Sequence, residues 1–179
     1  METSKKKLEK VYENLKSKFG YKNVMSAPKI KKIVVSVGTG SKIKIDKNKN
    51  EFIADRLSKI TGQKTSSRSA KQSIASFKLR QGEQIGLMVT LRGDRMYSFL
   101  DKLINIALPR TKDFRGLDAK CLDNIGNLTL GIKEHTIFPE TGDEELKDVF
   151  GLSITFVTSA KTKEEAKALF DYVGMPFKK

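Results

Sequence analysis

The residues best suited to chemistry in this 179-residue chain form a basic run between Gln63 and Arg80. This stretch of eighteen residues contains five Lys or Arg side chains and no Asp or Glu. Lys and Arg neutralise phosphates and release counterions, which gives an affinity for nucleic acid that falls steeply with salt. Hydroxyl groups between the cations can hydrogen-bond phosphates or ribose. The cations are Lys64, Arg68, Lys71, Lys78 and Arg80, and the hydroxyls belong to Thr65, Ser66, Ser67, Ser69, Ser73 and Ser76.

Two apolar side chains, Ile74 and Phe77, interrupt this basic run. Phe77 could stack on a nucleic-acid base, an interaction worth about 1–3 kcal/mol. Alternatively, both side chains could fix a solvated loop to the body of the protein, and for Phe77 the sequence leaves the two alternatives open. RNA is favoured over DNA because no helix-turn-helix, zinc-finger or leucine-zipper pattern is visible.

The charge of the chain is strongly asymmetric. The formal net charge is +14 and the sequence pI is about 9.8. Residues 1–100 contain 23 Lys or Arg against 8 Asp or Glu, whereas residues 101–179 contain 12 against 13. This distribution predicts one face that meets a polyanion, with nucleic acid favoured over an anionic membrane, and another face that meets water or protein.

Enzymatic chemistry is poorly supported by the sequence. His135 is the only histidine, and nothing near it in the chain suggests a paired nucleophile. Cys121 is the only cysteine, which excludes an intrachain disulfide and a thiol-rich metal site. A cluster of carboxylates lacks the alternate spacing of a calcium loop and indicates a solvated loop or a docking surface for a basic protein. We therefore expect no enzyme activity, no cofactor and no metal. The clustered carboxylates are Glu140, Asp143, Glu144, Glu145 and Asp148.

The length of the chain suits one domain with a sizeable core, so we expect a single RNA-binding domain over residues 1–179. The N-terminal residues lack the apolar core of a signal peptide, and no apolar run approaches the roughly 20 residues that span a bilayer. We expect a cytoplasmic protein without a membrane partner.

Apolar periodicity predicts the element order α–β–α–β–β–α–β–β–α. The inner βαββαβ corresponds to a ferredoxin-like, split βαβ arrangement of class α+β, with an N-terminal helix and a C-terminal strand–helix extension. Its helices would cover one face of an antiparallel sheet and leave the other face open for a ligand. The predicted helices lie at 8–19, 50–60, 96–107 (bounded by Pro109) and 162–173, and the predicted strands at 29–37, 65–68, 85–91, 128–133 and 152–158. Gly20 and Gly62 are placed to end the first two helices, and Thr162 and Glu165 form a capping box for the last.

Ordered segments through most of the chain resemble one known family. They are Gly62-Gln63-Lys64, Phe77-Lys78-Leu79-Arg80-Gln81-Gly82, Val89-Thr90-Leu91-Arg92-Gly93, Leu108-Pro109-Arg110, Asp113-Phe114-Arg115-Gly116-Leu117, Ile137-Phe138-Pro139-Glu140 and Pro176-Phe177-Lys178-Lys179. In these segments the sequence is similar to the bacterial ribosomal protein L5 family, which binds 5S ribosomal RNA.

This resemblance implies a structural protein in the central protuberance of the large ribosomal subunit. The implied partners are 5S RNA, large-subunit ribosomal RNA, the tRNA in the peptidyl site, protein thirteen of the small-subunit head and neighbouring large-subunit proteins. The basic loop around Arg68–Gly82 would reach the tRNA elbow, and two further loops would form a bridge to the small subunit.

The resemblance also implies roles for individual residues. Ser36 stands where relatives commonly carry Asn, and it keeps a hydrogen-bonding group. The implied ribosomal-RNA contacts are Ser36, Gln63, Lys64, Thr90 and Arg92. The implied tRNA contacts are Arg68, Lys71, Gln72, Ser73, Phe77, Lys78 and Arg80. The implied bridge residues are Asp113, Phe114, Arg115, Glu140, Asp143 and Glu144.

Two other function classes remain open from the sequence. An RNA-processing enzyme on the same fold would need His135 or a carboxylate as its acid–base group. A general RNA chaperone would use the basic half without preference among RNAs.

Overall fold

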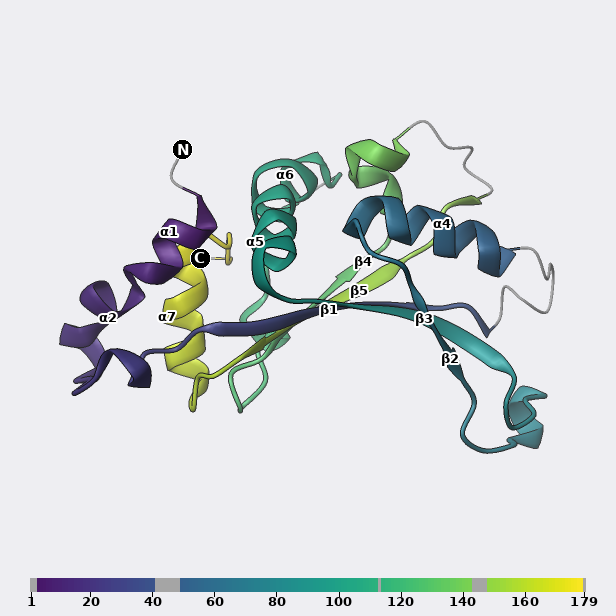
Figure 1. The fold of residues 1–179 in the computed structure, drawn as a ribbon, viewed down its shortest axis with the longest axis horizontal. Helices are drawn as coiled ribbons and strands as arrows, with labels where there is room; N and C mark the ends of the chain where they lie inside the picture. The colour runs from purple at the N-terminus through teal and green to yellow at the C-terminus, as the bar shows by residue number, and fades with distance from the viewer. Residues whose placement is uncertain (1–2, 41–48, 113, 143–147, 179) are drawn as a thin grey trace. The chain divides into compact units, whose positions relative to one another are not determined.

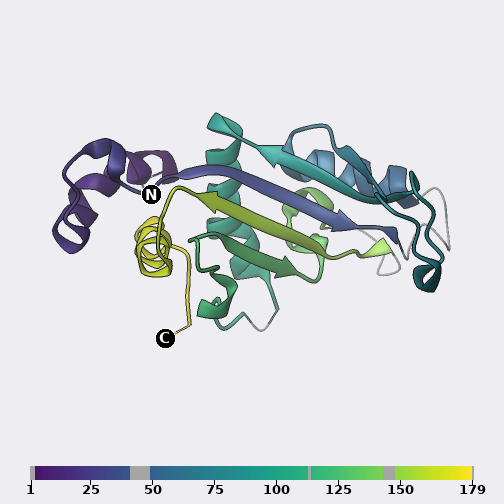
Figure 2. The same cartoon turned by 90° about the horizontal axis from the view of Figure 1, so that it is seen from below.

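The computed structural model describes residues 3–40, 49–112, 114–142 and 148–178 (Figure 1). Within these residues five strands form one sheet in the order β2-β3-β1-β5-β4, and the arrows of neighbouring strands run in opposite directions (Figure 2). The predicted α+β class and the ferredoxin-like antiparallel sheet are confirmed. The last strand precedes the C-terminal helix, as expected, and lies beside the first strand in the sheet. The strands are β1 (Ile30–Gly38), β2 (Ser66–Ser69), β3 (Gln84–Leu91), β4 (Leu128–Ile132) and β5 (Leu152–Thr158).

The chain divides into two compact units. Unit 1 comprises Met1–Ile33, Arg92–Leu130 and Thr155–Lys179, and unit 2 comprises Val34–Leu91 and Gly131–Ile154. The expectation of one RNA-binding domain over residues 1–179 stays a prediction.

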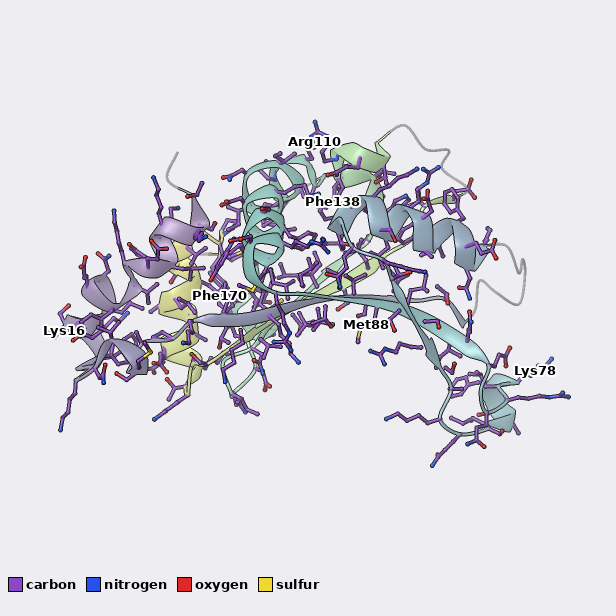
Figure 3. All side chains as sticks on the ribbon, in the orientation of Figure 1. Lys16, Lys78, Met88, Arg110, Phe138 and Phe170 are labelled. Carbon is purple, nitrogen blue, oxygen red and sulfur yellow. The ribbon has the colours of Figure 1, made fainter. Side chains whose placement is uncertain are left out.

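Strict alternation of burial organises the strands of unit 2. On β3, Leu87, Val89 and Leu91 are buried while Met88 and Thr90 are half-exposed. The helix α4 (Lys49–Thr61) packs against β3 and buries its apolar stripe of Ile53, Leu57 and Ile60. Because successive strand residues point to opposite sides, the half-exposed set faces away from α4. Figure 3 shows Met88 projecting from β3 on that side.

In unit 1 the predicted N-terminal helix is two helices, α1 (Ser4–Glu9) and α2 (Val11–Phe19), separated at Lys10. The backbone N–H and the hydroxyl of Ser4 both donate to Asp101 Oδ1, at 2.9 and 2.5 Å. These bonds hold α1 against the helix that contains Asp101, and both α1 and α2 pack against the C-terminal helix. The chain turns at Lys10 between them. Gly20 ends α2 in the left-handed conformation, as its position predicts.

The strongest predicted helix extends further than expected. α5 (Gly93–Lys102) continues through a π-helical segment, Leu103–Ala107, into α6 (Leu108–Arg110). Pro109 was expected to bound this helix, and that boundary is wrong, because Pro109 lies inside the helix, which ends at Arg110, three residues beyond the predicted end. A proline lacks its N–H and crowds the preceding turn, and the wider π turn directly before it relieves that crowding.

The C-terminal helix α7 (Lys163–Val173) begins with the predicted capping pair. Thr162 Oγ1 accepts from the Glu165 N–H at 3.3 Å, and Glu165 Oε2 accepts from the Lys161 N–H at 2.7 Å. Phe170 of α7 packs edge-on against Phe156 of β5, with ring centroids 5.8 Å apart. In the part of the chain that the structure describes, no helix is long and apolar enough to cross a membrane.

Replacement of Gly126 tests the tight packing between the turn before β4 and the start of α7. Gly126 has φ of +86°, and an added Cβ would lie 2.9 Å from the Ala160 Cβ. We expect Gly126→Ala to lower the free energy of unfolding by about 1–3 kcal/mol, measured by denaturant titration. The matched control is Gly131→Ala, where an added Cβ meets nothing within 4 Å, and its change should stay within about 0.5 kcal/mol. Equal effects of the two substitutions would contradict this account.

Candidate nucleic-acid interface

The basic run begins on an edge strand whose register is fixed by β3. Ser66 lies opposite Met88 and Arg68 lies opposite Gly86. Because directly opposite residues share one face of a sheet, Ser66 and Arg68 lie on the face away from α4. The register shifts between Arg68 and Ser69, so the hairpin is irregular from that point.

The long connection predicted between the two strands is an ordered continuation of the hairpin. The Ala70 N–H donates to the Glu83 carbonyl at 2.8 Å, and the Gly82 N–H donates to the Ala70 carbonyl at 3.0 Å. Further out, Ile74 and Leu79 exchange two backbone hydrogen bonds, at 3.0 and 3.2 Å. The tip is a short 3-10 turn, Ala75–Phe77, which Lys78 closes in the left-handed conformation with φ of +51°.

The Lys and Arg side chains of the hairpin are exposed to solvent. Arg68, Lys71, Lys78 and Arg80 are all exposed, and among the described residues none of their side chains forms an ion pair with a carboxylate. The Arg80 backbone N–H donates to Glu83 Oε2 at 3.2 Å. Lys78 extends outward from the tip (Figure 3). The Phe77 side chain is 64% exposed, so it does not anchor the hairpin in a core. These groups are arranged to meet an external polyanion.

An open hollow lies beside this cationic surface, with a volume of about 390 Å³. Ile74, Leu79 and Ile85 give it apolar walls, and Lys71 and Gln72 contribute polar edges. Ser73 has an internal role, because its Oγ accepts from the Gln81 N–H at 2.9 Å. Ser73 therefore uses its side chain to shape the hairpin itself. The apolar walls supplied by Leu79 and Ile85 were not singled out from the sequence.

Two residues implied to contact ribosomal RNA meet at the C-terminal end of α4. Gly62, with φ of +67°, ends the helix and directs the chain toward β2. Gln63 Nε2 then donates to the Thr90 carbonyl at 3.3 Å, at the end of the β2–β3 pair that is away from the hairpin tip. Continuing the β2–β3 register by two residues places the exposed Lys64 opposite Thr90. Ser36 is half-buried between the buried Val35 and Val37, so it lies on the face away from α4.

In unit 2 this face is small and rich in hydroxyls. Gly86 has no side chain, and an added Cβ would lie 3.0 Å from the Val37 carbonyl oxygen. A side chain at this position would meet the backbone of β1, so Gly86 allows the close approach of that neighbouring strand. Gly86 was missed in the sequence, although a glycine inside a strand pattern is the signal for such an approach. Arg92 belongs to unit 1, where it is exposed directly before α5. The hydroxyls on the face are those of Ser36, Ser66 and Thr90.

The residues implied to form a bridge are divided between the units. Phe114 is half-buried and Arg115 exposed in unit 1, and Glu140 is exposed in unit 2, in the turn Pro139–Thr141. The segment after Arg115 is fixed by two backbone hydrogen bonds, from Leu117 to Pro176 at 2.7 Å and from Lys178 to Leu117 at 2.9 Å. The predictions for Asp113, Asp143 and Glu144 lie outside the described residues.

His135 is a core residue and does not face the solvent. Its ring is fully buried and stacks on Phe150, with centroids 3.9 Å apart and planes at 11°. Its Nδ1 accepts from the Phe150 N–H at 3.3 Å, and its carbonyl accepts from the Thr141 hydroxyl at 3.0 Å. Cys121 is half-buried. Over the described ranges, no group of three or more His, Cys, Asp or Glu side chains is placed to hold a metal ion.

Two protein-family models cover most of the chain. One described as "Ribosomal protein L5" matches residues 23–80, and a second, which describes the C-terminus of the same ribosomal family, matches residues 84–177. Curated relatives bear the name "Large ribosomal subunit protein uL5". The relative from Trichlorobacter lovleyi is 51% identical over 177 residues, covering 96% of this chain and 98% of its own. The relative from Geobacter sulfurreducens is 52% identical over 168 residues, covering 94% and 93%. The relative from Flavobacterium johnsoniae is 51% identical over 170 residues, covering 95% and 92%.

Removal of the buried imidazole should cost stability and nothing else. We expect His135→Ala to lower the free energy of unfolding by about 2–4 kcal/mol, because it leaves a cavity beside Phe150 and removes the Nδ1 atom that accepts from the Phe150 N–H. Denaturant titration measures the loss, and the exposed neighbour Glu134→Ala serves as the control. RNA affinity of the folded variant, measured below its melting temperature, should be unchanged. A loss of RNA affinity without a loss of stability would show that His135 has a direct functional role.

Proposed function

Because this chain belongs to the ribosomal protein L5 family, it is a structural, non-enzymatic component of the large ribosomal subunit, and we propose that it binds 5S ribosomal RNA there. Its partners are ribosomal RNA and other ribosomal components. The burial of His135 agrees with a protein without catalysis. The proposed location within the subunit is the central protuberance.

The observation that carries the 5S proposal is the face of unit 2 that points away from α4. RNA is recognised largely through its phosphates and 2′-hydroxyls, which small hydrogen-bonding groups on a flat surface can reach. Ser36 and Thr90 supply hydroxyls, and Gln63 is held beside Thr90 by the 3.3 Å hydrogen bond to its carbonyl. One amide hydrogen and the amide oxygen of Gln63 are left to meet the RNA. Lys64 and Arg92 add positive charge close in the sequence to Gln63 and Thr90.

The hairpin supports a second contact, with the tRNA in the peptidyl site. Its backbone hydrogen bonds hold the tip in one conformation, so little ordering entropy is lost when it binds. Arg68, Lys71, Lys78 and Arg80 present charge to phosphates, and Phe77 presents an exposed ring to a base. Gln72 lines the hollow next to these groups and can hydrogen-bond a nucleotide there, and Ser73 keeps the hairpin in shape.

A third contact completes the proposal, a bridge to protein thirteen in the head of the small subunit. Arg115 and Glu140 are exposed. The other proposed bridge residues are Asp113, Phe114, Asp143 and Glu144. The carboxylates of the loop after Glu140 complement a basic partner. Neighbouring large-subunit proteins are proposed as further contacts.

Equilibrium binding across a salt series tests the 5S proposal. The full-length protein is titrated with 5S RNA and with an unrelated structured RNA of equal length. Both affinities should fall with salt, because both contain phosphate neutralisation. We expect 5S RNA to keep an advantage of about 100-fold, or about 2.7 kcal/mol, at every salt concentration. Coincident curves would favour a general RNA chaperone and reject specific recognition.

The same assay locates the recognition surface. Ser36→Ala combined with Thr90→Val should weaken 5S binding about 5- to 150-fold, because each substitution removes one hydrogen-bonding hydroxyl worth roughly 0.5–1.5 kcal/mol. Ser58→Ala is the matched control, since its hydroxyl donates to the Ala54 carbonyl within α4. If the control weakens binding as much as the double variant, the proposed face is wrong.

Charge reversal on the hairpin separates the tRNA contact from the 5S contact. We expect the triple variant Lys71→Glu, Lys78→Glu and Arg80→Glu to lower the affinity of reconstituted ribosomes for peptidyl-site tRNA about tenfold or more, through lost phosphate contacts. Its affinity for 5S RNA should change less than threefold. Filter binding measures both quantities.

The control for this variant carries the same charge change elsewhere, as Lys120→Glu, Lys133→Glu and Lys167→Glu, all at exposed positions. Equal losses of tRNA and 5S affinity in the hairpin variant would reject the division of labour between the hairpin and the sheet face.

A further inference from the structure

The segment between α2 and β1, Tyr21–Lys29, is exposed but held firmly at both ends to other parts of unit 1. At its start the Tyr21 hydroxyl donates to Glu165 Oε1 at 2.5 Å. Burial and this hydrogen bond raise the pKa of Tyr21, which keeps the phenol protonated as a donor. At its end Lys29 and Ser159 exchange two hydrogen bonds, from the Lys29 N–H to Ser159 Oγ at 3.0 Å and from the Ser159 N–H to the Lys29 carbonyl at 2.9 Å.

The middle of the segment is fixed by its own local hydrogen bonds. It forms a 3-10 turn, Val24–Ser26, which Asn23 caps by accepting from the Met25 N–H at 3.2 Å. The Ser26 hydroxyl donates to the Asn23 carbonyl at 2.5 Å, and the Ala27 N–H donates to the Val24 carbonyl at 3.2 Å. The segment is therefore preorganised.

This fixed turn presents two large apolar side chains to water. Val24 is 57% exposed and Met25 is 77% exposed, which makes Met25 the most exposed of the large hydrophobic side chains in the described ranges. A turn tethered at both ends could bury these side chains only by breaking its caps. Apolar groups held outward in this way indicate a surface that is completed by a partner.

Lysines flank the two apolar residues in the sequence. Lys16, Lys18, Lys22 and Lys29 are exposed, and between residues 10 and 29 the chain contains five Lys against one acid, Glu13. Lys18 lies over the half-buried ring of Phe19, 5.6 Å from its centroid, and this ring stacks on Tyr21 at 5.9 Å. The aromatic pair thus holds Lys18, which is close to the exposed turn Val24–Ser26 in the sequence. Lysine is depleted at protein–protein interfaces, so this charge favours a nucleic-acid partner.

We propose that Lys18, Lys22, Val24 and Met25 form a second RNA-binding surface, the N-terminal patch, which contacts large-subunit ribosomal RNA other than 5S RNA. The lysines neutralise phosphates, and Val24 and Met25 pack against an unstacked base. The choice of RNA rests on the proposed function, in which 5S RNA occupies the surface of unit 2. A chain with one RNA surface in each unit can join two RNA molecules.

The test measures the affinity of the full-length protein for two probes, deproteinised large-subunit RNA free of 5S RNA and 5S RNA alone. One variant combines Val24→Ser with Met25→Ser, and a second combines Lys18→Glu with Lys22→Glu. The apolar control is Ile125→Ser, which is 67% exposed in unit 1 and lies among acidic and polar neighbours. The charge control combines Lys120→Glu with Lys167→Glu. Thermal melting confirms that each variant is folded.

We expect each patch variant to weaken binding to large-subunit RNA at least tenfold and to change 5S affinity less than threefold. The controls should change both affinities less than threefold. The lysine variant should also reduce the slope of log affinity against log salt concentration by the equivalent of about two phosphate contacts. If Ser36→Ala with Thr90→Val leaves 5S binding intact, the 5S proposal fails while this result for large-subunit RNA stands.

Three outcomes would overturn the proposal. Unchanged affinity for large-subunit RNA in both patch variants would exclude RNA as the partner and point to a protein. Equal losses for both RNAs would show that the patch is not a separate surface. A loss in the lysine variant alone would reduce the patch to non-specific charge and remove the role of Val24 and Met25.

Discussion

The burial of Leu87, Val89 and Leu91 beneath α4 is the constraint on which the rest of unit 2 depends. Side chains alternate along a strand, so the burial of these three residues turns Gly86, Met88 and Thr90 to the other face. A slip of one residue would turn Leu87, Val89 and Leu91 away from the core. The face proposed to meet RNA is therefore fixed by the hydrophobic core on its reverse side, and its small polar residues need supply no stability themselves.

The same strand transmits this order to the hairpin. β2 pairs only with β3 in the sheet, so the position of Arg68 follows from that of Gly86. Beyond the shift in register, two further sets of backbone hydrogen bonds carry the geometry to the tip. A cluster of like charges repels itself, and a flexible loop would spread it. Backbone pairing across the hairpin does not use the charged side chains. It therefore keeps these charges close together despite their repulsion.

Local patterns in the sequence predicted much of this structure. Alternation located the strands, and Gly20, Gly62 and the Thr162–Glu165 pair located helix ends, because caps and periodicity act within a few residues. The bend at Lys10 depends on Ser4 reaching Asp101, and the placement of β5 beside β1 depends on pairing across more than a hundred residues. No local pattern records such contacts. The burial of His135 is similar, since its partner Phe150 lies fifteen residues away in the sequence. The candidate interface divides in the same way. The cations were visible as composition, whereas the contact between Gln63 and Thr90 required the fold to bring them together.

The exposed position of β2 also bears on the protein before it reaches the ribosome. β2 ends the sheet, and its outer edge has no strand beside it in the described structure. Such an edge can pair with the edge of another copy and seed aggregation. β2 is only four residues long, carries the charged Arg68 and is interrupted by the register shift at Ser69. Short length, charge and a bulge are the features by which natural sheets block edge-to-edge pairing. Arg68, which would face RNA in the assembled particle, can thus also keep the newly made chain from pairing with other copies of itself.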